Sequence, residues 1–304
     1  MLAFYLHDLD PVALRLSDSL AVRWYGLSYV LGFVLVFFIV RRFIRRGVCE
    51  IKEEGLLAWV VLGAFFAVVV GGRLGYVLLY ALAEGGMSWS EIVQPQRGGM
   101  SAHGAIAGIG VYCWCYARWH RIHAWNVIDA VSCSAPLGVF FGRLGNFVNG
   151  ELFGRVTSVP WAVKFPTELL HEDFIQQGGA SVALPSDARS SPEIIAFFER
   201  EAGGRENLEA LLHPRHPSQI YEALGEGLLM FALLYWLRMR FPKLPHGVLT
   251  AIFLLGYAVV RIAVEQFRQP DSGAQAILGL TRGQFFSLFM IVGGVALLVR
   301  AKKI

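Results

Sequence analysis

The chain contains 304 residues, of which 55% are hydrophobic and 16% charged, and its formal net charge is +4. Its mean hydropathy of +0.51 lies far above the values of soluble proteins, so the composition indicates a membrane protein. A net charge this small gives no reason to expect a nucleic-acid partner. Residues 1–20 lack the basic start and continuous apolar run of a cleaved signal peptide. We therefore expect the first membrane helix to act as an uncleaved signal.

Seven apolar windows are candidates for membrane-spanning helices, each of which needs about 20 mostly apolar residues. Four are clear: Trp24–Val40, Leu56–Leu79, Ile220–Leu237 and Gly247–Val264. Three are marginal or short: Met100–Ala117, Val127–Phe141 and Phe285–Val299. Each of these three must borrow flanking polar residues or have its ends covered by protein. The sequence therefore predicts an all-α integral membrane protein with about seven spans.

Basic residues follow the first, third, fifth and seventh windows, and a count of seven places all of these clusters on one side. The clusters are Arg41, Arg42, Arg45 and Arg46; Arg118 and Arg121; Arg238, Arg240 and Lys243; and Arg300, Lys302 and Lys303. Because basic loops stay in the cytoplasm, we expect the N-terminus outside and the C-terminus inside. A count of six or eight would divide the clusters between the two faces.

Polar residues stand at the outer ends of the first and third windows. Tyr25, in RWYGLSYVLGF, begins the first window, where an aromatic residue at the membrane interface is the ordinary explanation. His103, in GGMSAHGAIAGIG, opens the third window, and a lone histidine there is more often a hydrogen-bonded structural group than a base. The cysteines have neither C-x-x-C spacing nor a histidine partner, so we expect small core residues at Cys49, Cys113, Cys115 and Cys133.

The fourth window runs into the segment GRLGNFVNGELFGR, residues 142–155, in which four glycines alternate with polar residues: Arg143, Asn146, Asn149, Glu151 and Arg155. Glycines at this density weaken a helix and let the backbone approach a ligand closely. An arginine offers a planar fork suited to phosphate oxygens. A positively charged turn at the membrane interface is the alternative interpretation.

From residue 156 to residue 215 the composition turns polar, without an apolar run long enough to cross a membrane. We expect residues 156–215 to form an extracytoplasmic insertion, a small head, between spans four and five of a single polytopic membrane domain, residues 1–304. The insertion contains no motif that supports peptide docking. The chain has no internal repeat, so the inverted-repeat signature of many secondary transporters is missing.

Polar residues also line the fifth and sixth windows. Glu222 and Glu226 share a face in RHPSQIYEALGEG, where helix capping and interface anchoring are the plain explanation. In GYAVVRIAVEQFRQPD, steps of four, four and three place four residues within one quadrant of a helix that Pro270 ends: Tyr257, Arg261, Glu265 and Arg268. Ionisable groups at membrane depth are functional candidates by default. The alternative is that Arg261 and Glu265 form a pair that neutralises itself.

All these polar motifs lie at or near the outer leaflet under the seven-span count, so one shared site would explain them together. Two or more arginines suit an anionic lipid head group. Glutamates would orient the arginines, and a histidine would handle a proton. The sequence lacks a G-x-S-x-G elbow, an H-E-x-x-H helix and a P-loop, which are the usual markers of serine hydrolases, zinc proteases and nucleotide-driven enzymes.

The motifs resemble one family closely, the bacterial phosphatidylglycerol:prolipoprotein diacylglyceryl transferases. The matching segments run in family order from Arg23 to Asp271: RWYGLSYVLGF, GGRLGYVLLY, GGMSAHGAIAGI, GRLGNFVNGELFGR, RHPSQIYEALGEG and GYAVVRIAVEQFRQPD. The resemblance implies a seven-span protein of the bacterial inner membrane with an outside N-terminus. It also implies transfer of the diacylglyceryl group of phosphatidylglycerol to the lipobox cysteine of a prolipoprotein, with release of glycerol phosphate. Neither a metal nor another cofactor is expected.

The same resemblance implies which residues form the site. Catalytic roles fall on His103, Arg143, Glu151 and Arg261, and substrate-binding roles on Tyr25, Asn146, Gly154, Tyr257, Glu265 and Arg268. Arg143 and Arg261 match the two essential arginines of the family, and His103 matches the histidine proposed as its base. A cysteine thiol has an ordinary pKa of about 8.5, so the site must favour the thiolate. Either His103 or the field of the arginines would serve.

Two other functions remain open at this point. A lipid flippase or transporter would use the intramembrane charges to bind and move a substrate that it leaves unchanged. A phospholipid hydrolase would release diacylglycerol without a peptide thiol.

Overall fold

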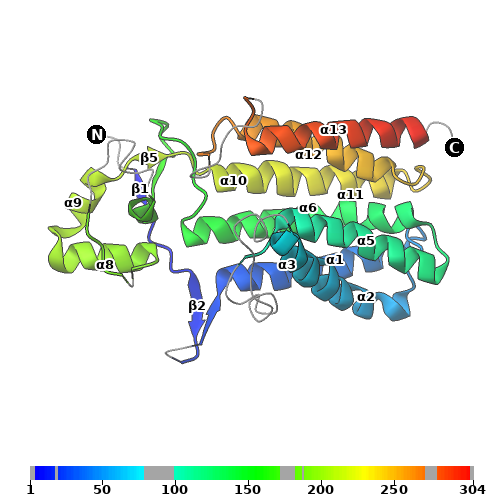
Figure 1. The fold of residues 1–304 in the computed structure, drawn as a ribbon, viewed down its shortest axis with the longest axis horizontal. Helices are drawn as coiled ribbons and strands as arrows, with labels where there is room; N and C mark the ends of the chain where they lie inside the picture. Colours follow the sequence, from blue (N-terminus) through cyan, green and yellow to red (C-terminus); the bar gives the residue numbers. More distant parts are fainter. Residues whose placement is uncertain are drawn as a thin grey trace. The chain divides into compact units, whose positions relative to one another are not determined.

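The computed structural model describes residues 4–17, 20–78, 99–171, 182–186, 188–270 and 279–301, and helices predominate among them (Figure 1). The chain divides into two compact units. Unit 1 comprises Met1–Gly32, Pro136–Leu233 and Leu254–Val295, and unit 2 comprises Phe33–Ala135, Leu234–Phe253 and Ala296–Ile304. Several long helices contribute one part to each unit.

Each of the seven predicted windows lies on a helix, apart from a few end residues. Met100, Ser101 and Gly247 precede their helices, and Leu79 falls outside the described residues. The first, third and fourth windows correspond to α1 (Trp24–Arg45), α5 (Ala102–His120) and α6 (Ala124–Asn149). The second is a continuous run of η1 (Glu53–Gly55), α2 (Leu56–Leu62), the π-helical η2 (Gly63–Val70) and α3 (Gly71–Tyr76). The fifth joins α10 (Ser218–Glu222), the π-helical η6 (Ala223–Leu229) and α11 (Met230–Arg240). The last two are α12 (Val248–Val264) and α13 (Arg282–Ala301).

Five helical runs within the described residues are long and apolar enough to cross a membrane: Trp24–Arg45, Glu53–Tyr76, Ala124–Asn149, Ser218–Arg240 and Arg282–Ala301. The apolar helix α12 has 17 residues and is shorter than these. Helix α5 has 19 residues and lies outside this group of five. The chain is therefore an all-α multi-pass membrane protein, as expected, whereas the count of seven and the orientation stay predictions.

Helix α6 continues well past the predicted end of its window at Phe141. It includes the first half of the glycine-rich segment and ends at Asn149, after which Gly150 adopts φ +68°. That left-handed conformation is favourable for glycine and commonly follows the last helical residue. Arg143, Asn146 and Asn149 therefore stand three residues apart on one helix, rather than in the loosened backbone that the glycines predicted.

Glycines let two helices of unit 2 approach each other. A Cβ atom added to Gly75 of α3 would lie 2.3 Å from the Cα atom of Gly104 in α5. Small residues of this kind are the usual means of close helix packing in membranes. In the same unit, the buried carboxylate of Asp129 accepts hydrogen bonds from the backbone N–H groups of Gly247 and Thr250, both at 2.8 Å. Asp129 thereby caps the first turn of α12 from outside that helix.

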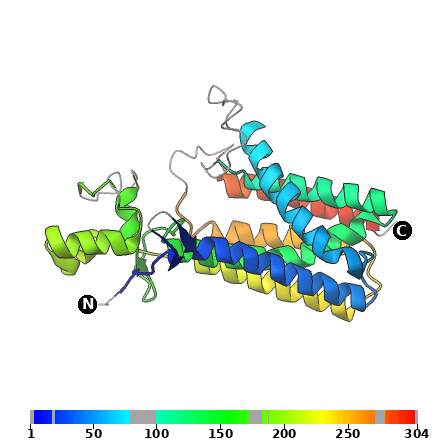
Figure 2. The same ribbon diagram turned by 90° about the horizontal axis from the view of Figure 1, so that it is seen from below.

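Residues 156–215, called the head below, pack around a hydrophobic core in unit 1, whereas their extracytoplasmic position stays a prediction. The head contains η5 (Pro166–Leu170), α8 (Ser191–Glu201), α9 (Gly204–Leu211) and the strands β4 (Val163–Lys164) and β5 (Pro214–Arg215). Helices α8 and α9 lie side by side in both views (Figures 1 and 2). Strand β1 (Tyr5–Leu6) comes from outside the insertion and pairs in parallel with β4, which pairs antiparallel with β5. The core contains Leu6, Ala188, Ile194, Ile195, Phe198, Leu208 and Leu212.

A two-stranded ribbon precedes α1. Strands β2 (Val12–Arg15) and β3 (Ala21–Arg23) pair antiparallel, with a register shift between Val12 and Leu14. Residues 12–23 are called the N-terminal ribbon below. Trp24 begins α1 immediately after the ribbon, and its N–H group donates to the carbonyl oxygen of Pro11 at 3.1 Å.

The cysteines only partly match the expectation of small core residues. Cys49, Cys113 and Cys133 are buried, but Cys115 is exposed. The prediction for Cys115 is wrong because α5 turns that position away from its protein neighbours, whereas Cys113 lies on the packed face. A difference of two residues on a helix is about 200°, so the two thiols point in nearly opposite directions.

A buried histidine makes the stability of the head dependent on pH. His7 is fully buried between Phe147 and Phe165, and its Nδ1 atom lies 2.8 Å from the Ser191 hydroxyl oxygen. Burial lowers the pKa of His7 below its ordinary value of 6.5. Below pH 6.5, His7 therefore binds a proton more readily in the unfolded chain than in the folded chain. The contribution of His7 to the free energy of unfolding is present above that pH and is lost as the pH falls.

We expect the unfolding free energy to fall by up to about 1.4 kcal/mol per pH unit below the ordinary histidine pKa. Chemical unfolding of the purified protein in detergent from pH 8 to pH 5 measures this slope. The variant His7→Phe keeps a ring among the phenylalanines but does not titrate, so its slope should be shallower. An equal slope in the variant would assign the pH dependence to other groups.

Candidate active site

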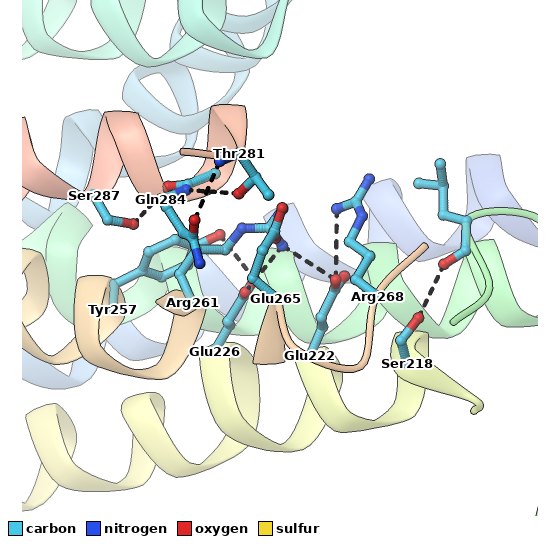
Figure 3. A network of polar contacts seen from close by, with 12 residues as sticks. Ser218, Glu222, Glu226, Tyr257, Arg261, Glu265, Arg268, Thr281, Gln284 and Ser287 are labelled. Carbon is cyan, nitrogen blue, oxygen red and sulfur yellow. Dashed lines mark hydrogen bonds and ion pairs between the residues drawn. The ribbon is translucent and has the colours of Figure 1, made fainter. Parts of the chain in front are cut away.

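Charged side chains from three helical runs of unit 1 meet in one polar network, and Figure 3 shows the residues that α10, η6 and α12 contribute to it. Its residues are Arg143 from α6, Glu222 from α10, Glu226 from η6, Tyr257 and Arg261 from α12, and Glu265 and Arg268, which follow α12. These residues are called the arginine–glutamate network below. It joins Arg143, Tyr257, Arg261, Glu265 and Arg268, which the sequence had placed in two separate motifs.

Glu222 is the centre of the arginine–glutamate network. One carboxylate oxygen lies 2.7 Å from Nε of Arg143. The other lies 3.1 Å from Nη1 of Arg261 and 3.5 Å from Nη1 of Arg268. The Glu222 side chain is fully buried. One carboxylate therefore holds three guanidinium groups in a fixed arrangement.

Glu226 and Glu265 complete the ion pairs. Glu226 is also fully buried, and it accepts a hydrogen bond from the Tyr257 hydroxyl at 2.8 Å and one from Arg261 at 3.3 Å. Its second contact with an arginine is longer, at 3.8 Å from Nη2 of Arg143. Glu265 lies 3.0 Å from Nη2 of Arg261, which is the i,i+4 pair of the alternative interpretation. The pair does not stand alone, because Arg261 also contacts Glu222 and Glu226.

The charges of the arginine–glutamate network balance, because three arginines face three glutamates in the contacts described. The arginine side chains keep only 10 to 17% of their surface exposed. Burial of so many charges is costly unless each is paired, and pairs in a medium of low dielectric constant interact strongly. Of the described contacts, those of Arg143 use Nε and Nη2. Arg143 thus offers a guanidinium edge to a further anion.

The start of α13 closes one side of the arginine–glutamate network. A Cβ atom added to Gly283 would lie 2.9 Å from both Nε of Arg261 and a carboxylate oxygen of Glu265. A carboxylate near the first turn of a helix is favourable because of the helix dipole. Thr281 and Gln284 hydrogen-bond each other at this helix start, at 3.1 and 3.2 Å (Figure 3).

The predicted helical stripe is wrong at Arg268, because α12 ends at Val264 and not at Pro270. Arg268 instead forms an antiparallel β-bridge with Gly154. The N–H group of Arg155 donates to the carbonyl oxygen of Phe267 at 2.9 Å, and Nε of Arg155 donates to that of Arg268 at 3.0 Å. These backbone contacts replace the last helical turn, although Arg268 still reaches Glu222.

Gly154 lies where three stretches of backbone meet. Its N–H group donates to the carbonyl oxygen of His216 at 2.8 Å. A Cβ atom at this position would lie 2.5 Å from the carbonyl oxygen of Phe267 and 2.6 Å from that of His216. Only glycine fits such a gap. Arg215, which is buried and paired with Glu168, donates to the carbonyl oxygen of Gly154 at 3.3 Å and supports the same segment.

A second cluster lies at the end of α6. The side-chain amide groups of Asn146 and Asn149 donate to the same carboxylate oxygen of Glu151, at 2.8 and 3.1 Å. The amide of Gln219 donates to the carbonyl oxygen of Glu151 at 2.7 Å. Gln219 belongs to α10, the helix that carries Glu222. The segment after α6 is therefore attached to the helix that centres the arginine–glutamate network.

Tyr25 belongs to the same unit as both clusters. A Cβ atom added to Gly145 would lie 2.8 Å from the Tyr25 ring, so the missing side chain lets this ring pack against α6. The hydroxyl oxygens of Tyr25 and Tyr29 are 3.0 Å apart. A binding role for Tyr25 stays a prediction.

His103 belongs to unit 2 and is the second residue of α5, where its side chain is exposed. Its assignment as the base stays a prediction.

Unit 2 also contains an arginine that was not among the predicted site residues. Arg73 of α3 is buried within the second helical run, and its Nη1 atom donates to the carbonyl oxygen of Gly99 at 2.7 Å. Its position inside an apolar window was the available signal.

Glu222 and Glu226 are the main residues of the network that are missing from the site residues implied by the resemblance, although glutamates were expected to orient the arginines. Helix capping and interface anchoring were the plain explanation, yet both side chains lie fully buried among arginines. Their spacing of four residues matches that of Arg261 and Glu265 on the neighbouring span, and two such stripes pair when the helices pack side by side. The π-helical η6 begins directly after Glu222 and contains Glu226. Such turns are frequent at functional sites.

The fold and the site together define a multi-pass membrane protein that holds a buried, charge-balanced arginine–glutamate cluster. A model of the family described as prolipoprotein diacylglyceryl transferase matches residues 11–300. A protein of Bdellovibrio bacteriovorus named phosphatidylglycerol-prolipoprotein diacylglyceryl transferase is 37% identical, over 97% of this chain and 93% of its own length. Proteins of the same name from Neisseria gonorrhoeae and Idiomarina loihiensis are 39% and 37% identical, over 97% of this chain and 96% and 94% of their own lengths. The chain belongs to the prolipoprotein diacylglyceryl transferase family.

Proposed function

We propose that this chain transfers the diacylglyceryl group of phosphatidylglycerol to a prolipoprotein, which is the first step of lipoprotein maturation. The acceptor is the thiol of the lipobox cysteine, and glycerol phosphate is released. The observation that carries the proposal is the buried arginine–glutamate network, in a chain that belongs to this family along nearly its whole length. The proposed site of action is the bacterial inner membrane, on its outer side.

In the proposed reaction the thiolate attacks the glycerol carbon that bears the phosphate ester. A carbon–sulfur bond forms and the carbon–oxygen bond to phosphate breaks. The electron pair of that bond leaves with the phosphate oxygen, and the thiol proton passes to a base, for which His103 is the candidate. Negative charge therefore grows on the phosphate during the reaction, where positively charged donors lower the barrier.

Arg143 and Arg261 are the proposed donors to the phosphate. Arginine suits this task because its rigid, planar fork matches phosphate oxygens, and because it stays charged when buried. Glu222 contacts both guanidinium groups, at 2.7 and 3.1 Å, so they are oriented before substrate arrives. Donors that are already oriented need no reorganisation during the reaction, which is where most of their catalytic advantage lies.

Asn146, Gly154 and Tyr25 are proposed binding residues around the head group and the cysteine, and Glu151 is the proposed catalytic residue beside them. Asn146 and Glu151 hydrogen-bond each other, so they act as one unit rather than as separate contacts. Gly154 fixes the backbone beside Arg268. These placements support the family roles.

The test is a mass measurement on a synthetic lipobox peptide incubated with the purified protein and phosphatidylglycerol. We expect a gain equal to one diacylglyceryl group on the cysteine. The same peptide with serine in place of cysteine should stay unmodified, and so should the cysteine peptide without phosphatidylglycerol. Folded protein that modifies no peptide would contradict the proposal.

The same experiment separates the two other functions. A flippase would move lipid between leaflets of a vesicle and make no product in detergent. A hydrolase would release diacylglycerol from phosphatidylglycerol when the peptide is left out.

A further inference from the structure

The N-terminal ribbon has one face that is entirely apolar. The register pairs Leu14 with Val22, and the N–H group of Leu16 donates to the carbonyl oxygen of Leu20 at 2.9 Å. Because side chains alternate between the two faces of a strand, Leu14 and Leu16 share a face with both of their partners. The three leucines of this face are 57%, 58% and 59% exposed. The residues of this apolar face are Leu14, Leu16, Leu20 and Val22.

An apolar face of this kind needs a cover. A ribbon of two strands is at best marginally stable in water unless a hydrophobic face packs against something. Strand β2 pairs only with β3 among the described residues, and the leucines keep more than half of their surface exposed. Scattered exposed leucines are ordinary, but adjacent ones on one face mark an interaction surface.

The opposite face of the ribbon carries a charge, because Arg15 pairs with Ala21 on that face. Arg23 directly follows Val22 on β3, so it also lies outside the apolar face.

The ribbon lies across the direction of the membrane helices. In Figure 1 it runs at a steep angle to α10, and in Figure 2 it is seen nearly end-on beside the start of α1. The last ribbon residue, Arg23, directly precedes Trp24, the first residue of a helix long and apolar enough to span a membrane. A strand of this length reaches on the order of 15 Å. The ribbon thus extends sideways at the level where that helix enters the membrane.

We propose that the N-terminal ribbon docks on the lipid surface, with the leucines of its apolar face inserted among the phospholipids next to α1. The partner is the phospholipid leaflet itself, because the apolar face belongs to a ribbon that leads directly into a helix long and apolar enough to span the membrane. Arg15 and Arg23 lie outside this apolar face, at the level of the phosphate groups.

The docking has a consequence for the site. Tyr25 is the second residue of α1, two residues after the ribbon ends. A ribbon held in the lipid surface fixes the depth and rotation of this first turn, and with them the position of the Tyr25 ring against Gly145. The ribbon would keep one wall of the site level with the head groups of the lipid substrate.

Site-specific fluorescence quenching in vesicles tests this placement. Cys115 is the exposed cysteine, whereas the other three are buried and unreactive, so a Cys115→Ala background accepts a label at one new cysteine. A bimane label is placed at Leu16→Cys, on the apolar face, or at Arg15→Cys, on the charged face. A third label, at Glu206→Cys on the exposed side of α9, serves as the aqueous control.

We expect phospholipids brominated on their acyl chains to quench the label at residue 16 several-fold more than the labels at 15 and 206. Iodide in the buffer should show the reverse order. Equal iodide quenching at 16 and 206, with no effect of bromine, would overturn the proposal. A label at 16 that is shielded only when a lipobox peptide is added would also overturn it, because the ribbon would then be a peptide-binding surface. Each readout is independent of transfer activity.

Discussion

Replacing Arg143 by alanine should lower the turnover of diacylglyceryl transfer by at least about 100-fold, equivalent to about 2.7 kcal/mol of barrier. Arg143 is the most exposed of the three arginines, with 17% of its side chain exposed against 13% for Arg261 and 10% for Arg268, so we expect it to contact the phosphate most directly. The measurement is kcat and KM for phosphatidylglycerol with a fixed lipobox peptide. The loss should fall mainly on kcat, because charge on the leaving phosphate grows only as the bond breaks.

The Arg143 variant should still fold. Glu222 keeps two of its arginine contacts, to Arg261 and Arg268, so no carboxylate is left buried without a partner. Arg143→Lys should recover little activity, since one ammonium group cannot hold Glu222 and grip phosphate oxygens as a planar fork does.

Arg205→Ala is the matched control for Arg143. It removes one arginine from the exposed surface of the head, where the contact with Asp8 is 3.6 Å long, and should change turnover by no more than about twofold. Near-normal turnover in a folded Arg143→Ala protein would remove this arginine from the mechanism.

The helices of this protein could be predicted from the sequence because membrane spans follow from composition over a long window. All seven windows lie on helices, including the marginal Val127–Phe141, which belongs to a helix of 26 residues. That helix is longer than predicted because glycine lowers helix propensity by only about 1 kcal/mol per residue, which packing readily outweighs. Gly145, for example, gives Tyr25 the space to pack against α6.

The site was predicted in part. The stripe of Tyr257, Arg261 and Glu265 was visible because a charged residue in an apolar helix is conspicuous and the helical period gives its face. The central position of Glu222 could not be predicted, because it depends on which helix packs beside α10. The local sequence does not determine that packing partner. The bend after Val264 is likewise set by backbone pairing with Gly154, more than 100 residues earlier in the chain.

Replacing Gly154 by alanine should damage both the stability and the activity of this protein, although it adds only one methyl group. The added Cβ atom would lie 2.5 Å and 2.6 Å from two backbone oxygens, which cannot rotate away as a flexible side chain would. The segments would have to separate, which weakens the bond from Gly154 to His216 and that from Arg155 to Phe267. We expect a loss of about 3 kcal/mol of stability and, because Arg268 would shift from Glu222, a fall in turnover of at least about tenfold.

Gly142→Ala is the matched control, because it places the same methyl group in the same motif. A Cβ atom at Gly142 has no neighbour within 4 Å, and the residue lies inside α6. Alanine there should raise stability by about 0.5 to 1 kcal/mol, since it is the better helix former, and leave turnover nearly unchanged. Thermal unfolding in detergent and transfer assays on both variants measure these effects. Equal behaviour of the two variants would mean that the three backbone segments around Gly154 are not held as closely as described, and that Arg268 reaches Glu222 without that support.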